Sequence, residues 1–374
     1  MELFNEDGKP KILAYYLPQF YPTEFNDKWY GKGFTEWTNV GRAKPIFKGH
    51  NQPRVPTELG YYDMRLPETA EKQAELATEA GVSGFAYWHY WFGNGRVQLE
   101  MPYQRLLKTG KPDFPFCLAW ANESWYKKMW DANETKKLIC EQTYPGDEDI
   151  EAHFNYCLPA FRDHRYLTYK GRPIFIIYKP YDYPDVAHFM EKWNTMIRKT
   201  GVADGFYFIA TIYKTDQTDD MLEKGFDAVT YEGWSKLMSK LFYEDQTAIK
   251  KVKRIVRNRI IAPFFHVAKK LHYKDLLKGI WREGFDSREN VVPILIPNFD
   301  HSPRSGRRNY VVVDDQPENW KKQIDIVFSG IKAKENKLVM LRAWNEWGEG
   351  NYMEPDLKYG RSYIETLKDS MDKQ

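Results

Sequence analysis

Eight short runs of apolar residues recur along the chain. Their hydrophobicity is nearly continuous, which is typical of parallel strands covered on both faces and not of a half-exposed sheet. We therefore predict eight buried strands, at residues 12–17, 84–87, 116–119, 174–178, 207–212, 228–231, 293–296 and 338–343.

Helical patterns separate several of these runs. The clearest begins at Pro67, has Ala70, Ala74 and Ala77 along one face, and ends where Gly81 can cap it. Alternation of strands and helices, with about eight strands, predicts an α/β fold, a (β/α)₈ TIM barrel with long loops on its C-terminal face. An open doubly wound sheet has the same local pattern and is the alternative.

The length of 374 residues suits one barrel with insertions, so we expect residues 1–374 to form a single catalytic domain. Three intervals are too long for simple crossovers: 18–66, 122–172 and 234–290. Residues 250–260 of the third are basic and amphipathic. We interpret them as a solvated helical face, with peripheral membrane contact as the alternative.

Charge and cysteine content exclude several classes of protein. Lys and Arg number 55 against 52 Asp and Glu, a balance too even to indicate nucleic-acid binding. Cys117, Cys140 and Cys157 lack the spacing of a zinc site, and we expect neither a metal nor a cofactor. The N-terminus is unlike a signal peptide and no apolar stretch would span a membrane, so we expect a cytoplasmic protein. Removal of an upstream signal would instead indicate a periplasmic or secreted one.

Aromatic residues make up 16% of the chain. Sugar rings pack their C–H faces on aromatic side chains, so this content suits a saccharide cleft, but a large aromatic core explains it equally well. Aromatic and polar clusters directly follow four of the predicted strands: LPQFYP, HYWF, WANESW and WNEWGEG. That is where the active site of a barrel is built, although aromatic residues at strand ends can also simply cap the barrel.

Glu346 and Glu349, in RAWNEWGEG, are the candidate catalytic carboxylates. Cleavage of a glycosidic bond generally needs two carboxyl groups, and a helical turn over 345–350 would place these two on one face. Two close carboxylates also resist ionising together, which leaves one as an acid and one as a base. An ExxE pattern is common on solvated helices, but here it follows an apolar strand and lies among Trp and Gly residues.

Further residues of these clusters are candidates for substrate binding. Glu123 would hold a sugar hydroxyl or form a salt bridge at the barrel rim, and His89 would donate to a sugar or be an internally bonded core histidine. Asn345 would orient the neighbouring acid. The full set is Tyr16, Trp37, His89, Trp91, Trp120, Asn122, Glu123, Trp125, Tyr178, Trp344, Asn345, Trp347 and Glu354.

Other chemistries lack a motif. The sequence contains no Walker, HExxH or GxSxG pattern, and Gly31 and Gly33 do not precede a helix as a dinucleotide site requires. Asp147 and Asp149 form a DxD triplet like that of a nucleotide-sugar metal site. They follow Pro145 and Gly146, so we interpret them as the acidic start of a helix.

The same segments resemble a known family. YYLPQFYP, GKGFTEWTNV, NQPRVPTELGYYD, GFAYWHYWF, LAWANESW, LPAFRDHRY, GRPIFIIY and RAWNEWGEG with YMEPD are similar to the WbsX group, which is labelled as lipopolysaccharide-biosynthesis glycosyltransferases. The resemblance runs in order from about Tyr15 to Tyr363. The group is more distantly similar to family 99 glycoside hydrolases, which are retaining endo-α-mannosidases and endo-α-mannanases on a (β/α)₈ barrel.

The second resemblance implies a mechanism through a 1,2-anhydro sugar. Matched to the family's glutamate pair, Glu346 would deprotonate the sugar 2-hydroxyl and Glu349 would serve as acid and then base, with no metal or nucleotide. The long insertions depart from the mannosidase pattern, which leaves the substrate open. The leading hypothesis is a hydrolase of a bacterial-type polysaccharide. A glycosyltransferase of lipopolysaccharide or capsule synthesis and a non-catalytic sugar-binding barrel are the alternatives.

Overall fold

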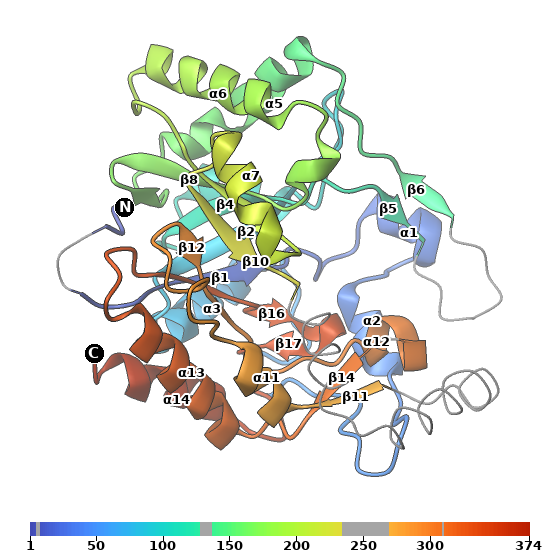
Figure 1. Ribbon diagram of the computed structural model, residues 1–374. Coiled ribbons are helices and arrows are strands. Elements are labelled where there is room, and N and C mark those ends of the chain that lie inside the picture. Colours follow the sequence, from blue (N-terminus) through green and yellow to red (C-terminus); the bar gives the residue numbers. More distant parts are fainter. Residues whose placement is uncertain (5–7, 128–136, 234–268, 309) are drawn as a thin grey trace, which may run out of the picture.

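The protein is a closed barrel of parallel strands surrounded by helices (Figure 1). The structure is a computed structural model that describes residues 1–4, 8–127, 137–233, 269–308 and 310–374. Each of the eight predicted strands is present, within a few residues of its predicted bounds. In barrel order they are β1 (Lys11–Tyr16), β2 (Gly84–Trp91), β4 (Phe116–Trp120), β8 (Arg172–Ile177), β9 (Tyr207–Ile212), β10 (Ala228–Tyr231), β12 (Val291–Val292) with β13 (Ile294–Leu295), and β15 (Leu338–Leu341).

One barrel position is occupied by two short strands. Pro293 separates β12 from β13, because proline has no N–H to donate to a ladder. β12 pairs with β10, β13 pairs with β15, and the carbonyl of Pro293 still accepts from Met340 N at 2.9 Å. Since β12 and β13 are the two ends of the strand order and are joined through Pro293, the sheet closes on itself. The prediction of a TIM barrel is confirmed.

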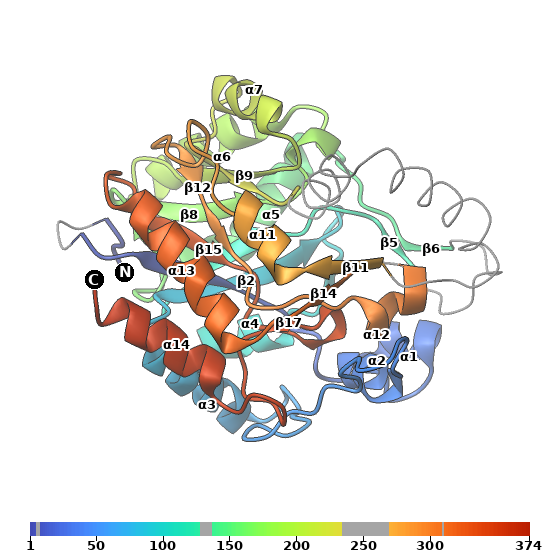
Figure 2. The same ribbon diagram turned by 60° about the horizontal axis from the view of Figure 1, so that its bottom comes forward.

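Helices cover the outside of the barrel. The predicted helix at Pro67 is α3, and the acidic triplet at Asp147 begins α5, as interpreted from the sequence. In Figure 2, α13 and α14 lie side by side against the sheet. The helices are α3 (Pro67–Glu79), α4 (Met101–Thr109), α5 (Asp147–Phe161), α6 (Val186–Thr200), α7 (Thr218–Glu223), α11 (Tyr273–Gly279), α13 (Pro317–Ile331) and α14 (Ser362–Met371).

Small elements are added to the barrel, and some of them lie within the predicted insertions 18–66, 122–172 and 234–290. α2 (Glu36–Arg42) contacts α12 (Ser302–Ser305), and both figures show them together. The others are α1 (Glu24–Tyr30), β3 (Val97–Gln98), β5 (Trp125–Tyr126), β6 (Leu138–Cys140), β7 (Thr168–Tyr169), β11 (Lys269–His272), β14 (Tyr310–Val313), β16 (Asn345–Glu346) and β17 (Asn351–Tyr352), with 3₁₀ turns η1 (Pro180–Asp182), η2 (Thr215–Gln217), η4 (Gly306–Arg308) and η5 (Trp347–Glu349). The basic segment 250–260 lies outside the described residues.

Much of the aromatic content lies in the core between the sheet and its helices. Trp193 of α6 is fully buried against Phe161 of α5 and Phe175 of β8. Trp320 of α13 is equally buried, and its indole N–H donates to the carbonyl of Tyr363 at 3.2 Å. The core therefore accounts for part of the aromatic excess. In the described part of the chain, no helix is both long and apolar enough to cross a membrane.

Candidate active site

A cavity of about 730 Å³ opens among the segments that follow the barrel strands. β1, β2, β4, β8 and β15 each lead into residues that line it, and α1, α2 and α12 complete the wall. This volume is typical of a small-molecule site. The lining residues are Leu17, Gln19, Asn26, Tyr30, Phe34, Glu36, Asn39, Trp88, Tyr90, Ala121, Glu123, Ser124, Trp125, Tyr126, Lys127, Tyr178, Asp182, Arg304, Arg342, Glu346 and Glu349.

Both predicted catalytic carboxylates line the cavity, but the local backbone differs from the predicted helical turn. Glu346 ends the short strand β16, which pairs with β17, and Glu349 ends the single 3₁₀ turn η5. Gly350 follows in the left-handed region at φ 51° and reverses the chain into β17. A tight hairpin, not a helix, therefore presents the two glutamates together.

Gly348, between the two glutamates, allows the close packing on which the site depends. A Cβ atom at this position would lie 1.9 Å from Glu36 Oε1 and 2.8 Å from Arg304 Nε. Real Cβ atoms do not approach other atoms that closely, so position 348 needs glycine. The missing side chain leaves room for the carboxylate of Glu36 on α2 and the guanidinium of Arg304 on α12 to reach the hairpin that carries the two glutamates.

The buried guanidinium of Arg304 joins the carboxylates of this site. Its Nη1 lies 2.6 Å from Glu349 Oε1 and 3.1 Å from Glu346 Oε2, and its Nε lies 2.8 Å from Glu36 Oε1. Asn39 Nδ2 also donates to Glu36 Oε1 at 2.9 Å. A single cation thus holds three acidic side chains that would otherwise repel one another.

A second guanidinium, that of Arg342, approaches Glu349 from the end of β15. Its Nη2 lies 3.1 Å from Glu349 Oε2, and its Nη1 lies 2.7 Å from Glu232 Oε2. Glu232 directly follows β10 and is buried. His301 Nε2 also faces Glu349, 3.6 Å from Oε1. Glu349 therefore lies between two arginines, each of which contacts a further carboxylate.

Burial raises the pKa of Glu346 to about 7. Arg304 opposes this rise, and the neighbouring Glu349 adds to it. A carboxyl group with a pKa near neutrality suits proton transfer, because it gains and loses a proton near the working pH.

Of the predicted substrate-binding residues, Glu123, Trp125 and Tyr178 line the cavity. The carboxylate of Glu123 is about half exposed and lies 3.9 Å from Lys179 Nζ. The ring of Trp125 is half-buried and is supported edge-on by Tyr90 and Phe92. A supported aromatic ring in a cavity wall is a suitable platform for a sugar.

Several other predicted residues pack around the hairpin of the two glutamates and do not line the cavity. Asn345 Oδ1 accepts from Leu17 N at 2.7 Å, which ties the hairpin to the end of β1. Glu354 is buried and accepts from the indole N–H of Trp347 at 2.6 Å. Three more predicted residues also lie outside the cavity lining. The hydroxyl of Tyr16 donates to Gln73, Trp37 packs on Trp347, and Trp344 packs on Phe85.

The remaining candidates lie outside the cavity lining, and two of them, Trp91 and Trp120, pack against His153 of α5. The indole N–H of Trp120 donates to the carbonyl of Trp91 at 2.9 Å, and the ring of Trp91 stacks on His153 at 4.8 Å. Asn122 bonds the backbone N–H and carbonyl of Lys179. None of Trp91, Trp120 and Asn122 lines the cavity, and all three are buried.

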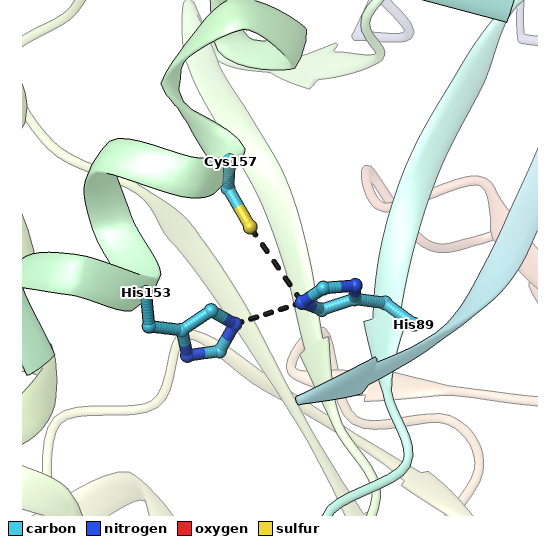
Figure 3. A group of neighbouring side chains, drawn as sticks. All are labelled: His89, His153 and Cys157. Atoms are coloured by element: carbon cyan, nitrogen blue, oxygen red, sulfur yellow. Dashed lines mark hydrogen bonds between the residues drawn. The ribbon is translucent and has the colours of Figure 1, made fainter. Parts of the chain in front are cut away.

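His89 belongs to this same region, where it meets His153 and Cys157 (Figure 3). Their three possible metal-binding atoms lie within 4.8 Å of one another. The two Nε2 atoms are 2.8 Å apart, closer than the ~3.3 Å that two nitrogen ligands keep on a tetrahedral zinc ion. Burial lowers the pKa of both histidines, so they are neutral, and one N–H donates to the other ring. The geometry is that of a hydrogen-bonded core pair.

The charged residues that form ion pairs with or around the two glutamates, Glu36, Glu232, Arg304 and Arg342, were not among the sequence candidates. Glu36 and Arg342 lie within motifs already noted, GKGFTEWTNV and RAWNEWGEG, and Glu232 directly follows a predicted strand. Their positions in the sequence could therefore have identified all three as candidates. Arg304 lies in HSPRSGRR, where no feature of the sequence distinguishes it from a surface arginine. Only the folded chain brings it to the carboxylates.

The family model for glycosyltransferase WbsX matches residues 12–367. The chain belongs to this family. Its curated relatives include the uncharacterised protein WxcX of Xanthomonas campestris pv. campestris, which is 31% identical over 363 residues in one strain and 30% in strain B100. These matches cover 96% of this chain and 49% of the relatives, so the chain spans about half of their length.

Two solved structures illustrate the similarity of the fold. A glycoside hydrolase-like protein superposes with a TM-score of 0.60 at 14% identity, covering 99% of this chain and 96% of that one. The GH99 endo-α-mannosidase of Bacteroides thetaiotaomicron, in complex with bis-tris-propane, gives 0.55 at 14% identity, covering 99% and 98%. At this level of identity the likeness concerns the fold. The description of the matching family, glycosyltransferase WbsX, refers to carbohydrate-active enzymes.

Proposed function

We propose that this WbsX member is a retaining glycoside hydrolase that cleaves a 1,2-trans glycosidic bond in a bacterial-type polysaccharide. The observation that carries the proposal is the contact of one Arg304 nitrogen with both Glu346 and Glu349. The two contacted oxygens cannot be farther apart than the 3.1 and 2.6 Å contacts combined. Inverting enzymes keep their carboxyl groups about 6.5–9.5 Å apart to admit a water, and retaining enzymes about 5–5.5 Å.

In the first step, Glu346 takes the proton of the sugar 2-hydroxyl. The freed oxygen attacks C1 as the bond from C1 to the leaving oxygen breaks, and Glu349 protonates that oxygen. The product is a 1,2-anhydro sugar. The similarity to the GH99 endo-α-mannosidase supports this route, in which both glutamates act on protons.

In the second step, Glu349 takes a proton from water, which attacks C1, and Glu346 returns its proton to the 2-oxygen. C1 inverts twice, so its configuration is retained. The attack from C2 requires the 2-oxygen and the leaving group on opposite faces, which admits α-mannosides, α-rhamnosides and β-glucosides and excludes α-glucosides.

The proposed roles fix where the proton of the pair must be. Catalysis begins with Glu346 ionised and Glu349 protonated. Burial raises the pKa of Glu346 to about 7, whereas Glu349 contacts two arginines that favour a carboxylate, so in the resting pair the proton favours Glu346. The reactive form is then the minority arrangement of a singly protonated pair. Because the pair loses its last proton near pH 7, turnover should fall above that pH.

A transferase that uses a nucleotide sugar would have to hold its diphosphate. The two guanidinium groups of the cavity, those of Arg304 and Arg342, are already bonded to carboxylates. This favours the hydrolase over the transferase that the family description suggests. A binding barrel without catalysis would gain nothing from burying two coupled glutamates, which is costly.

The test is incubation with a panel of defined α-mannosides, α-rhamnosides, β-glucosides and α-glucosides, with and without nucleotide sugars, followed by product analysis. We expect hydrolysis of at least one 1,2-trans glycoside with retention and without any nucleotide. A 2-deoxy analogue of the substrate should not react. Its rapid cleavage would make Glu346 a direct nucleophile, and products formed only with a nucleotide sugar would make the chain a transferase.

A further inference from the structure

We propose that Glu232 is a positioning residue that acts through Arg342 and allows Glu349 to carry a proton. This inference rests on the proposed function, in which Glu349 is the general acid. Glu36 is placed to play the same part through Arg304. Both carboxylates contact the far side of a guanidinium that also contacts Glu349.

The two arginines that contact Glu349 oppose its proposed role as an acid. Glu349 Oε1 lies 2.6 Å from Arg304 and Glu349 Oε2 lies 3.1 Å from Arg342. An opposite charge within about 4–6 Å favours the ionised form of a carboxyl group. Two arginines devoted to Glu349 would therefore keep it ionised and unable to protonate a leaving group.

Glu232 reduces the influence of Arg342 on Glu349. Its Oε2 lies 2.7 Å from Arg342 Nη1, closer than Glu349 does to Nη2. Burial raises the pKa of Glu232, whereas Arg342 lowers it and favours the carboxylate. With Glu232 ionised, the positive charge of Arg342 is shared between two carboxylates.

The charged and titratable groups that face Glu349 come from several elements. Arg304 and His301 approach from α12 and its N-terminal flank, Arg342 from the end of β15, and Glu346 from β16. Around Glu232, the groups that affect its pKa are Arg342, Glu349 and, more weakly, Lys179. Arg342 is the group that contacts both Glu232 and Glu349.

Glu232 also gives a cleaner experiment than Glu36. Glu36 lines the cavity, so its substitution would disturb substrate as well as charge, whereas Glu232 is buried and does not line it. Its Oε1 has no hydrogen-bond partner among the described residues, so the contact with Arg342 is its main described interaction. A substitution at position 232 should therefore act mainly on Arg342 and, through it, on Glu349.

The experiment is an NMR titration of the whole protein labelled with ¹³C at the glutamate carboxyls, with Glu349 assigned from the signal lost in Glu349→Gln. In Glu232→Gln we expect the Glu349 midpoint to move to lower pH by about one pH unit. Glu232→Asp, which keeps the charge, should restore most of the change. Glu75→Gln, which removes an exposed carboxylate from α3, is the matched control and should leave the midpoint unchanged.

A double variant distinguishes an effect of Glu232 on the pKa of Glu349 from a purely structural role of Glu232. If Glu232 acts through Arg342, then Arg342→Gln combined with Glu232→Gln should return the Glu349 midpoint toward higher pH, because the unbalanced cation is gone. An unchanged midpoint in Glu232→Gln, or the same low midpoint in the double variant, would overturn the proposal. Should Glu232→Gln fail to fold, Glu232→Asp and the double variant still decide the question.

The titration needs no substrate, so its outcome is independent of the proposed hydrolysis. A shifted Glu349 midpoint together with inactivity toward every glycoside would retain the electrostatic role and reject the hydrolase. Once a substrate is known, Glu232→Gln should lower kcat more than it raises KM, and should move the acidic limb of the pH profile to lower pH.

Discussion

The segment WANESW contributes one tryptophan to each of two different regions of the molecule. Trp120 ends β4, is 2% exposed, and packs behind the barrel against His153 and Phe189. Trp125, five residues later, is half-buried and lines the cavity. From the sequence, both tryptophans are equally good candidates for stacking on a sugar ring. An aromatic residue inside a strand can face the outer helices and belong to the core, and one beyond the strand end is free to reach the cavity.

The carboxylates divide in the same way. Glu346 and Glu349 line the cavity, and Glu354, a few residues later, is buried beneath it against Trp347 and Gln73. The contrast between cavity-lining and supporting residues predicts different outcomes for substitutions that look alike in sequence.

The largest effect is expected at Glu346 and Glu349, the proposed catalytic pair. Glu346→Gln and Glu349→Gln should each reduce turnover by about 10²–10⁴ while the protein remains folded, because each removes a general acid or base. The measurements are kcat on a proven substrate and circular dichroism. Near-normal turnover in either variant would remove that residue from the mechanism.

The next effect is expected at Gly348. In Gly348→Ala the new Cβ would displace Glu36 and Arg304 and shift the carboxylates, and a misplacement of about 1 Å can cost ~10² in rate. Gly41→Ala is the matched control, because Gly41 lies on α2 with Glu36 and a Cβ there meets nothing within 4 Å. Equal activity of the two variants would show that the close packing is dispensable.

The two tryptophans give a direct comparison. Trp120→Ala should lower the free energy of unfolding by about 3–5 kcal/mol, because it leaves a core cavity. Trp125→Ala should leave stability nearly unchanged and weaken substrate binding about tenfold, ~1.4 kcal/mol. Urea unfolding and binding titrations of both variants measure this. Similar losses of stability would contradict the division into two regions.

The smallest effect concerns Glu354. Burial raises its pKa to about 7 from the ordinary 4.5, so the buried group favours the protonated form. Its contribution to stability is fully present below pH ~4.5 and is lost as the pH rises through about 7. The stability advantage of wild type over Glu354→Gln should therefore be greater at pH 5 than at pH 8. A constant difference in urea unfolding at the two pH values would show that Glu354 is ionised throughout.

The barrel could be predicted because buried parallel strands leave continuous apolar runs, as at 207–212 and 228–231, which match β9 and β10 to the residue. The placement of the glutamate pair followed from strand position. Its hairpin did not, because the pairing of β16 with β17 depends on the left-handed turn at Gly350 and on Asn345 bonding to Leu17. The role of Arg304 could not be predicted from the sequence, because its partners are 42 to 268 residues away along the chain.

Pairing of β1 with β15 has a consequence for how the protein is made. Lys11 lies opposite Leu338 in this ladder, so β1, which is translated before the other barrel strands, receives this neighbour only when the last of them has been made. Until then a nascent chain carries an open sheet edge, which invites pairing with other chains. The glutamate pair is translated just after the closing strand. A chain terminated before residue 338 would therefore lack both the barrel seal and the proposed chemistry, so incomplete translation products would be inactive and prone to aggregate.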